Sequence, residues 1–135
     1  MPATEYLETA VLGHLLRAST WAKPTGIWLA VLTALPTDEG GLVEVAAADY
    51  ARLAAGPSDS LWIVREADGA VINAAAMVWT DPLSAWGLAK GVAAYDAASA
   101  GNAFAWAAFG TARDVVANGP ALMAQPGTLV WRLNV

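Results

Sequence analysis

The side chains able to carry out catalysis or bind a metal are few in this sequence. It holds one histidine, His14, and no cysteine. Zinc sites and cysteine–histidine catalysis need several such residues, so the sequence does not supply their parts. A serine–histidine–aspartate triad would have to recruit His14, and no Gly-x-Ser-x-Gly turn is present to expose a serine. We therefore interpret His14 as a packed or surface residue and expect no catalytic residue, no cofactor and no bound metal.

Carboxylates are the other groups that could do chemistry. A pair of them could hydrolyse glycosides, and Asp38, Glu39 and Glu44 could form a calcium site. No EF-hand pattern supports calcium, and acidic residues in turns are usually solvated or bonded to their own backbone. Both sites stay open as alternatives to the expectation that the protein is not an enzyme. Six of the twelve acidic residues fall in predicted turns: Asp38, Glu39, Glu66, Asp68, Asp81 and Asp96.

Tyr50 and Arg52 are two residues apart. On a strand this spacing places both side chains on the same face. We interpret them as a structural pair, in which the tyrosine packs and the arginine bonds a loop carboxylate or carbonyl. A binding site at this pair is the alternative.

The composition indicates that other subunits cover part of the surface. The chain has 135 residues, which fits a single domain over residues 1–135. Charged residues make up 14%, whereas about 25% is usual. The seven tryptophans agree with a homo-oligomer, because tryptophan is enriched at interfaces. Trp79, Trp86 and Trp106 are candidates for an oligomer or docking surface, and burial in the core is the alternative for each.

The charge and the hydropathy pattern argue against two classes of partner. The net charge of −5 does not favour phosphate binding, so we expect no direct contact with nucleic acid. No apolar run reaches the roughly 18 residues that a membrane span needs, so we expect no membrane partner.

The first element that would position these residues is a helix over residues 4–19. Thr4 can cap its first turn. Leu7, Val11 and Leu15 recur at spacings of four, which gives the helix one apolar stripe. The stripe must be buried against the rest of the chain or against a neighbouring subunit, so these three residues are a further candidate docking surface.

The remainder, residues 26–135, reads as many short strands separated by turns. Apolar or alternating runs at residues 26–34, 50–54, 61–65 and 128–135 are bounded by proline, glycine and aspartate. Residues 66–69 contain Asp-Gly and suit a two-residue hairpin turn. This pattern predicts an all-β fold, an antiparallel β-sandwich of jelly-roll type with an N-terminal helix.

Residues 86–106 form the centre of the predicted sandwich. Two apolar runs there are joined by the polar turn 96–102, as in a β-hairpin. Propensity alone would favour a helix over residues 92–108, because alanine is the best helix former. Gly101 and several aromatic residues interrupt this segment, and Gly87, Gly91 and Gly110 flank it, so we predict strands. For residues 111–119 helix and strand both stay open.

An ordered set of short motifs resembles a family of small tail fibre or minor tail proteins of tailed bacteriophages. The resemblance extends over nearly the whole chain, and the N-terminal helix with Tyr6-Leu7 also fits. Its motifs are the strand at residues 26–33, LPTDEGG at 35–41, Glu44-Val45, Tyr50-Ala51-Arg52, Trp86-Gly87 and YDAASAGN at 95–102.

The chain departs from the family pattern at two places. Residues 46–49 replace a glycine-rich spacer, and Ala100 stands where the pattern has glycine. Because alanine rarely adopts positive φ, we expect left-handed backbone geometry to be lost there.

The resemblance implies a non-enzymatic virion structural protein of the β-sandwich type. It implies partners among other virion proteins and further copies of the chain, with a homotrimer expected by analogy with other fibres. A virion component of this kind would be assembled in the cytoplasm of the bacterial host. A capsid decoration or collar protein, and a module that recognises a host-surface saccharide through aromatic side chains, are the alternatives.

Overall fold

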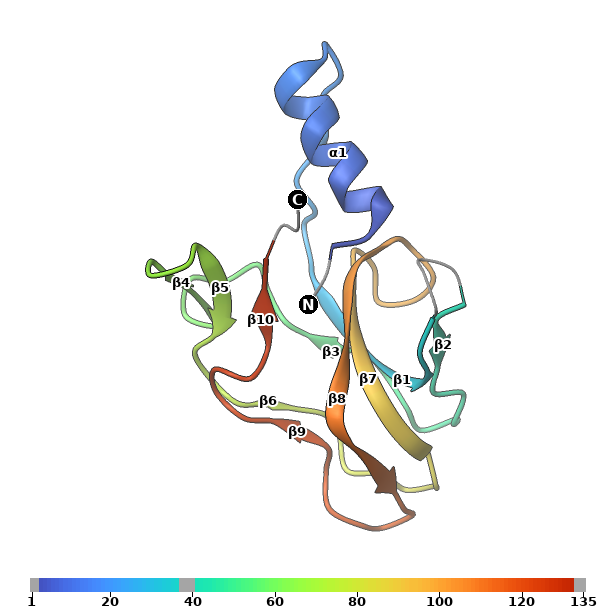
Figure 1. Cartoon of the computed structure of the whole chain (residues 1–135). Coiled ribbons are helices and arrows are strands. Elements are labelled where there is room, and N and C mark those ends of the chain that lie inside the picture. The colour runs from blue at the N-terminus through green and yellow to red at the C-terminus, as the bar shows by residue number, and fades with distance from the viewer. Residues whose placement is uncertain (1–2, 37–40, 133–135) are drawn as a thin grey trace.

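The computed structural model describes residues 3–36 and 41–132 (Figure 1). Asp38 and Glu39 of the possible calcium site, and the last three residues of the predicted final strand, lie outside the described residues. The described part contains α1 (Glu5–Leu16), β1 (Trp28–Ala34), β2 (Val43–Glu44), β3 (Leu53–Ala54), β4 (Trp62–Arg65), β5 (Ala70–Asn73), β6 (Met77–Val78), β7 (Gly87–Tyr95), β8 (Ala103–Val115), β9 (Met123–Ala124) and β10 (Val130–Trp131).

The largest sheet has the order β2-β1-β7-β8, and β3 also pairs with β1. Strand β7 pairs antiparallel with β1, from Trp28 opposite Tyr95 to Leu32 opposite Gly91. It also pairs with β8 through the turn at residues 96–102, so the predicted central hairpin is confirmed. Leu29, Ala30, Val31 and Leu32 are all buried, which is expected of a strand covered on both faces.

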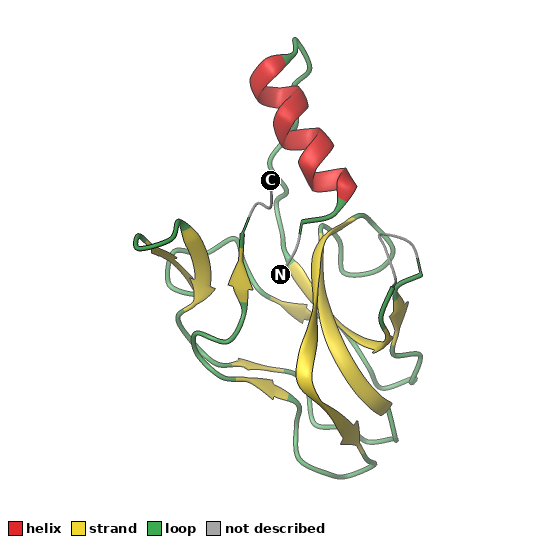
Figure 2. Ribbon diagram, viewed as in Figure 1, coloured by secondary structure: helices red, strands yellow, loops and turns green. Residues whose placement is uncertain are grey.

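Two smaller sheets, β10-β5-β4 and β6-β9, complete the sandwich (Figure 2). The prediction of an antiparallel β-sandwich with an N-terminal helix is confirmed. The buried core draws its strand residues from the largest sheet and from β6-β9, and the half-buried Trp62 and Trp131 of the sheet β10-β5-β4 pack against it. Its buried residues include Leu29, Val31, Met77, Trp79, Trp86, Val92, Phe104, Val115, Leu122, Ala124 and Leu129.

Helix α1 begins as predicted and ends earlier. The Thr4 side chain accepts a hydrogen bond from the Leu7 amide, and the Thr4 hydroxyl donates to the Ala103 carbonyl at 2.6 Å, which ties the cap to β8. The helix ends at Leu16 rather than at residue 19. Ser19 lies beyond the end of the helix, and its hydroxyl donates to the Gly13 carbonyl, which also accepts the Arg17 amide. In the described part of the chain, no helix has the length and apolarity to cross a membrane.

Other boundaries also differ from the predictions. The Asp-Gly turn is a four-residue loop between Arg65 and Ala70, because Asp68 bonds both the Arg65 guanidinium and the Ala70 amide. The expected strand at residues 50–54 is limited to β3. Tyr50 is not part of the strand, and its hydroxyl bonds the Val31 amide of β1 and the Glu44 carboxylate instead. Residues 111–115 belong to β8, and a turn with Asn118 at φ 58° follows.

Candidate functional site

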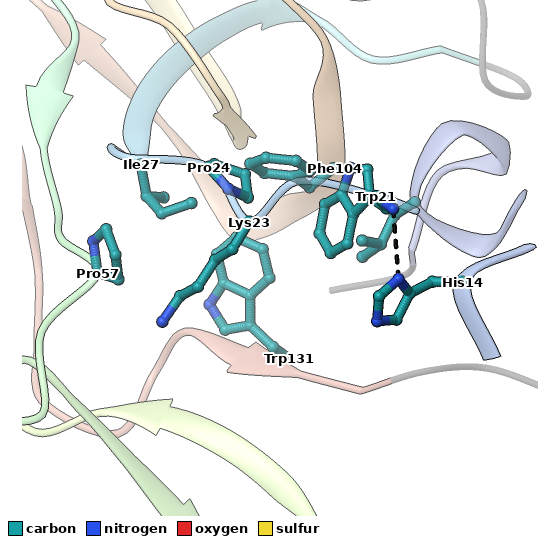
Figure 3. A pocket seen from close by; sticks show the side chains of 9 residues that line it. His14, Trp21, Lys23, Pro24, Ile27, Pro57, Phe104 and Trp131 are labelled. Carbon is teal, nitrogen blue, oxygen red and sulfur yellow. Dashed lines mark hydrogen bonds between the residues drawn. The ribbon is translucent and has the colours of Figure 1, made fainter. Parts of the chain in front are cut away.

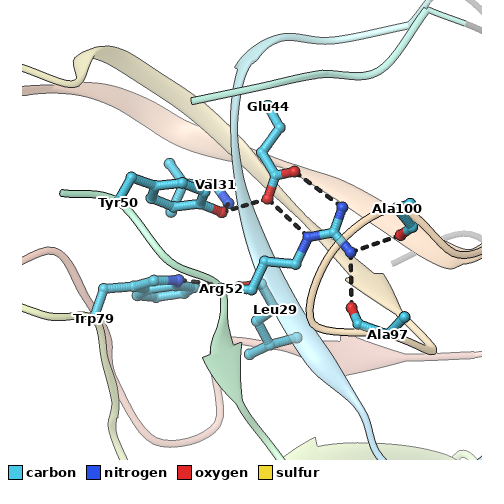
Figure 4. A network of polar contacts seen from close by, with 8 residues as sticks. All are labelled: Leu29, Val31, Glu44, Tyr50, Arg52, Trp79, Ala97 and Ala100. Atoms are coloured by element: carbon cyan, nitrogen blue, oxygen red, sulfur yellow. Dashed lines mark hydrogen bonds and ion pairs between the residues drawn. The ribbon is translucent and has the colours of Figure 1, made fainter. Parts of the chain in front are cut away.

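Arg52 lies at the centre of a buried polar network, and its side chain is only 6% exposed (Figure 4). Its Nε and Nη2 donate to the two carboxylate oxygens of Glu44 at 2.9 and 3.0 Å. Its Nη1 donates to the carbonyls of Ala97 at 2.7 Å and Ala100 at 2.8 Å. The guanidinium also lies over the Tyr95 ring, 3.8 Å from its centroid. Arg52 therefore joins β2 to the turn between β7 and β8.

Tyr50 completes the network from the other side of Glu44. Its hydroxyl donates to the Glu44 carboxylate at 2.7 Å and accepts the Val31 amide of β1 at 2.9 Å. Burial, followed by the hydrogen bond to Glu44, raises the pKa of Tyr50 well above that of a free tyrosine. Tyr50 and Arg52 thus share one carboxylate, which sequence spacing alone did not identify.

The turn that Arg52 binds is held by its own side chains. Asp96 accepts the Asn102 amide at 2.7 Å and the Asn102 side-chain amide at 3.0 Å. Gly101 has φ 76°, and a Cβ there would lie 2.4 Å from the Asp96 carboxylate. The expectation that Ala100 loses left-handed geometry is wrong, since its φ is 51°. The surrounding hydrogen bonds, including that of Arg52 to the Ala100 carbonyl, hold the alanine in this conformation.

A second cluster surrounds Asp49, in the segment between β2 and β3. Its carboxylate accepts the Leu83 amide at 2.8 Å, the Trp86 indole N–H at 3.0 Å and the Ser84 hydroxyl. These bonds, that of Ser84 first, hold the pKa of Asp49 well below its usual range. The Trp86 ring also meets Tyr50 edge to face at 5.2 Å, so the two clusters are continuous.

The predicted docking tryptophans do not form a common surface. Trp79 and Trp86 are 2% and 5% exposed, and the Trp79 indole donates to the Leu29 carbonyl at 3.1 Å. Their candidacy is therefore corrected, because both are core residues with their indole N–H groups satisfied inside the chain. Trp106 is half-buried on β8.

The predicted helix stripe is divided between two environments. Leu7 packs against the core, Val11 is half-buried and Leu15 is 69% exposed. Leu12 and Leu16 are 56% and 79% exposed. Sequence reasoning missed these two leucines, because a four-residue spacing was followed along one side only and α1 is apolar around most of its circumference.

An aromatic groove lies between the segment after α1 and the sheet β10-β5-β4, with a cavity of 510 Å³ beside the helix (Figure 3). Trp21 and Phe104 meet edge to face at one end, and Trp62 and Trp131 do so at the other. His14 belongs to this wall, where its Nδ1 accepts the Trp21 amide at 3.3 Å. The residues that line the groove are Leu7, His14, Trp21, Lys23, Pro24, Ile27, Pro57, Ser58, Asp59, Trp62, Val71, Phe104 and Trp131.

The arrangement offers two kinds of feature. The polar network is occupied by bonds within the chain and serves to fasten β1, β2 and the central hairpin together. The groove and the outer leucines of α1 are open, apolar and suited to contact with another molecule. Within residues 3–36 and 41–132 no three metal-ligating side chains gather.

Comparison with known proteins gives one family. The family model described as podophage GP4 fiber I protein gp80 matches residues 2–132. No curated protein matches the chain. The match includes both the polar network and the aromatic groove.

Proposed function

The chain belongs to the family of the podophage GP4 fiber I protein gp80, and we propose that it is a non-enzymatic structural protein that associates with itself and docks on other proteins of the phage particle. The family makes it a phage fibre protein and a component of the virion. Self-association, the docking partners and assembly in the host cytoplasm are the proposed part.

The observation that carries the proposal is the exposed apolar surface of α1. None of its side chains is fully buried, and Leu15 and Leu16 are 69% and 79% exposed. A helix that is apolar around most of its circumference normally has partners on several sides. With only 14% charged residues, the chain also has few groups to keep such a surface soluble as a monomer.

We propose a homotrimer in which α1 forms part of the contact between subunits. The proposal is tested by the mass of the purified protein in solution, measured by light scattering over a range of concentrations. A trimer is expected. A monomer at all concentrations would contradict self-association.

Position on the particle needs a second measurement. Intact particles labelled with an antibody against this chain should carry the label on a fibre. A label on the head surface or at the neck would instead favour the capsid decoration or collar alternative.

Recognition of a host saccharide is a second candidate, and we propose the aromatic groove, rather than Trp79 or Trp86, as its site. Trp79 and Trp86 are buried, whereas Trp21, Trp62 and Trp131 in the aromatic groove are half-buried, so part of each of these rings could stack on a sugar. Its walls are mainly apolar, whereas a sugar also needs polar partners for its hydroxyls. A glycan array with the purified protein tests this candidate.

A further inference from the structure

The outer side of α1 presents three leucines that we call the leucine face: Leu12, Leu15 and Leu16. They are 56%, 69% and 79% exposed, and their spacings of three and four residues place them together on the last turns of the helix. Figure 1 shows α1 projecting from the β-sandwich, so the leucine face stands clear of the strands. Glu8 precedes the face by one turn and Arg17 follows it.

The aromatic groove is the complementary surface on the same chain. The groove consists of two cavities, of 510 and 480 Å³, and Ile27, Pro57 and Trp131 line both, so the two cavities adjoin. The charged side chains among its lining residues are Lys23 and Asp59. The chain's own helix cannot fill the groove with its leucine face, because Leu7 and His14 already form part of the groove wall.

We infer that the leucine face of one copy lies in the aromatic groove of a second copy. This inference rests on the proposed self-association and specifies its contact. The apolar groove matches the three leucines, because both surfaces lose unfavourable contact with water when they meet. The charges match as well, since Glu8 can pair with Lys23 and Arg17 with Asp59.

This contact joins two different surfaces of the chain, so it runs from head to tail. Such a contact closes into a ring when successive rotations add up to a full turn, and a rotation of about 120° gives a trimer. A symmetric contact between two helices would join the same residues from each copy. The two arrangements therefore place different residue pairs next to each other.

Cysteine cross-linking separates these arrangements, because the natural chain contains no cysteine. Leu16→Cys marks the leucine face, and Asp59→Cys marks the exposed part of the groove. When the two variants are mixed and mildly oxidised, we expect at least tenfold more disulfide-linked dimer than either variant gives alone. Thr111→Cys, at an exposed position of β8, is the control and should cross-link with neither.

Each outcome of the cross-linking experiment supports or refutes the groove contact. If Leu16→Cys alone gives as much dimer as the mixture, the helices pair symmetrically and the leucine face does not bind in the groove. If the wild type is a trimer but the mixture does not cross-link, the groove contact is wrong and self-association stands. If the wild type is a monomer at all concentrations, both proposals fail. Glycan binding by such a monomer would assign the groove to a saccharide.

A second variant tests the leucine face without relying on cysteine geometry. Leu15→Glu combined with Leu16→Glu changes two exposed residues, so the fold should be retained, as circular dichroism can verify. We expect association at least tenfold weaker than that of the wild type. Unchanged association in the folded variant would overturn the inference.

Discussion

Replacing Arg52 with methionine should destabilise the protein far more than replacing an exposed arginine. Methionine keeps most of the aliphatic stem, so the change mainly removes the four hydrogen bonds of the guanidinium. Among the described residues, Glu44 then keeps the hydrogen bond from the Tyr50 hydroxyl, and the carbonyls of Ala97 and Ala100 lose their bonds from Arg52. Removing one partner of a buried ion pair costs about 3–5 kcal/mol.

The lower end of that range applies here. The Arg52 side chain is 6% exposed, but Glu44 is 25% exposed and can regain some hydration. We therefore expect a loss of about 3 kcal/mol. With a denaturant slope of about 2 kcal/mol per molar urea, the unfolding midpoint should fall by about 1.5 M. The tryptophans allow the transition to be followed by fluorescence, at one fixed protein concentration.

Arg65→Met is the matched control. Arg65 also pairs with a carboxylate, that of Asp68, but the two side chains are 38% and 33% exposed. Such surface pairs contribute little, so the midpoint of this variant should stay close to that of the wild type. A shift for Arg52→Met no larger than that for Arg65→Met would refute the role assigned to the network.

A double variant tests whether Glu44 and Arg52 act as a pair. Glu44→Gln removes the charge that Arg52 neutralises while keeping an acceptor in place. If the two groups are coupled, the combined variant should lose less stability than the two single losses added together, by about 0.5–3 kcal/mol. Additive losses would mean that the carbonyl contacts of Arg52 account for its effect.

Three further changes have expected directions. Ala100→Gly should raise stability by about 0.5–1 kcal/mol in urea unfolding, because the φ of 51° strains alanine; Ala67→Gly, at a loop position that is not itself at positive φ, should lower it. Asp49 has a pKa held low in the folded chain, so its contribution is present above about pH 4 and lost as the pH falls; an Asp49→Asn variant should show a flatter loss of stability in acid. Tyr50 has a raised pKa, so its contribution is present below about pH 10 and lost as the pH rises; Tyr50→Phe should show a shallower alkaline loss, measured by circular dichroism.

The elements that the sequence predicted well are those whose signals are local. The central hairpin could be read from two apolar runs joined by the turn 96–102, and the Thr4 cap from residue type and position. Boundaries failed where a distant side chain decides them. The strand at residues 50–54 is shortened because the Tyr50 hydroxyl bonds the Val31 amide, 19 positions earlier. No local pattern encodes such a contact.

The candidate surfaces were harder to predict because exposure depends on how the whole chain packs. Trp79 and Trp86 have the composition of interface residues, yet their indole N–H groups have acceptors in the interior. The residues that line the aromatic groove are spread from 7 to 131 along the chain. Their spacing in the sequence predicts neither that they come together nor that they form an apolar surface. The sequence shows that residues 21 and 131 are tryptophans, but it does not show that Trp21 and Trp131 line the same cavity.

The family motifs and the proposed contact surfaces therefore have different physical roles. The motif residues form hydrogen bonds with one another and hold the central hairpin against β1 and β2. They are Glu44, Tyr50, Arg52 and the turn 96–102. Because these side chains already bond one another, few of their donors and acceptors remain to bind a partner protein. The leucine face and most of the aromatic groove lie outside the motifs, and their apolar side chains are free to pack against another molecule. Stability experiments should consequently respond to changes in the motifs, and assembly experiments to changes in the exposed leucines.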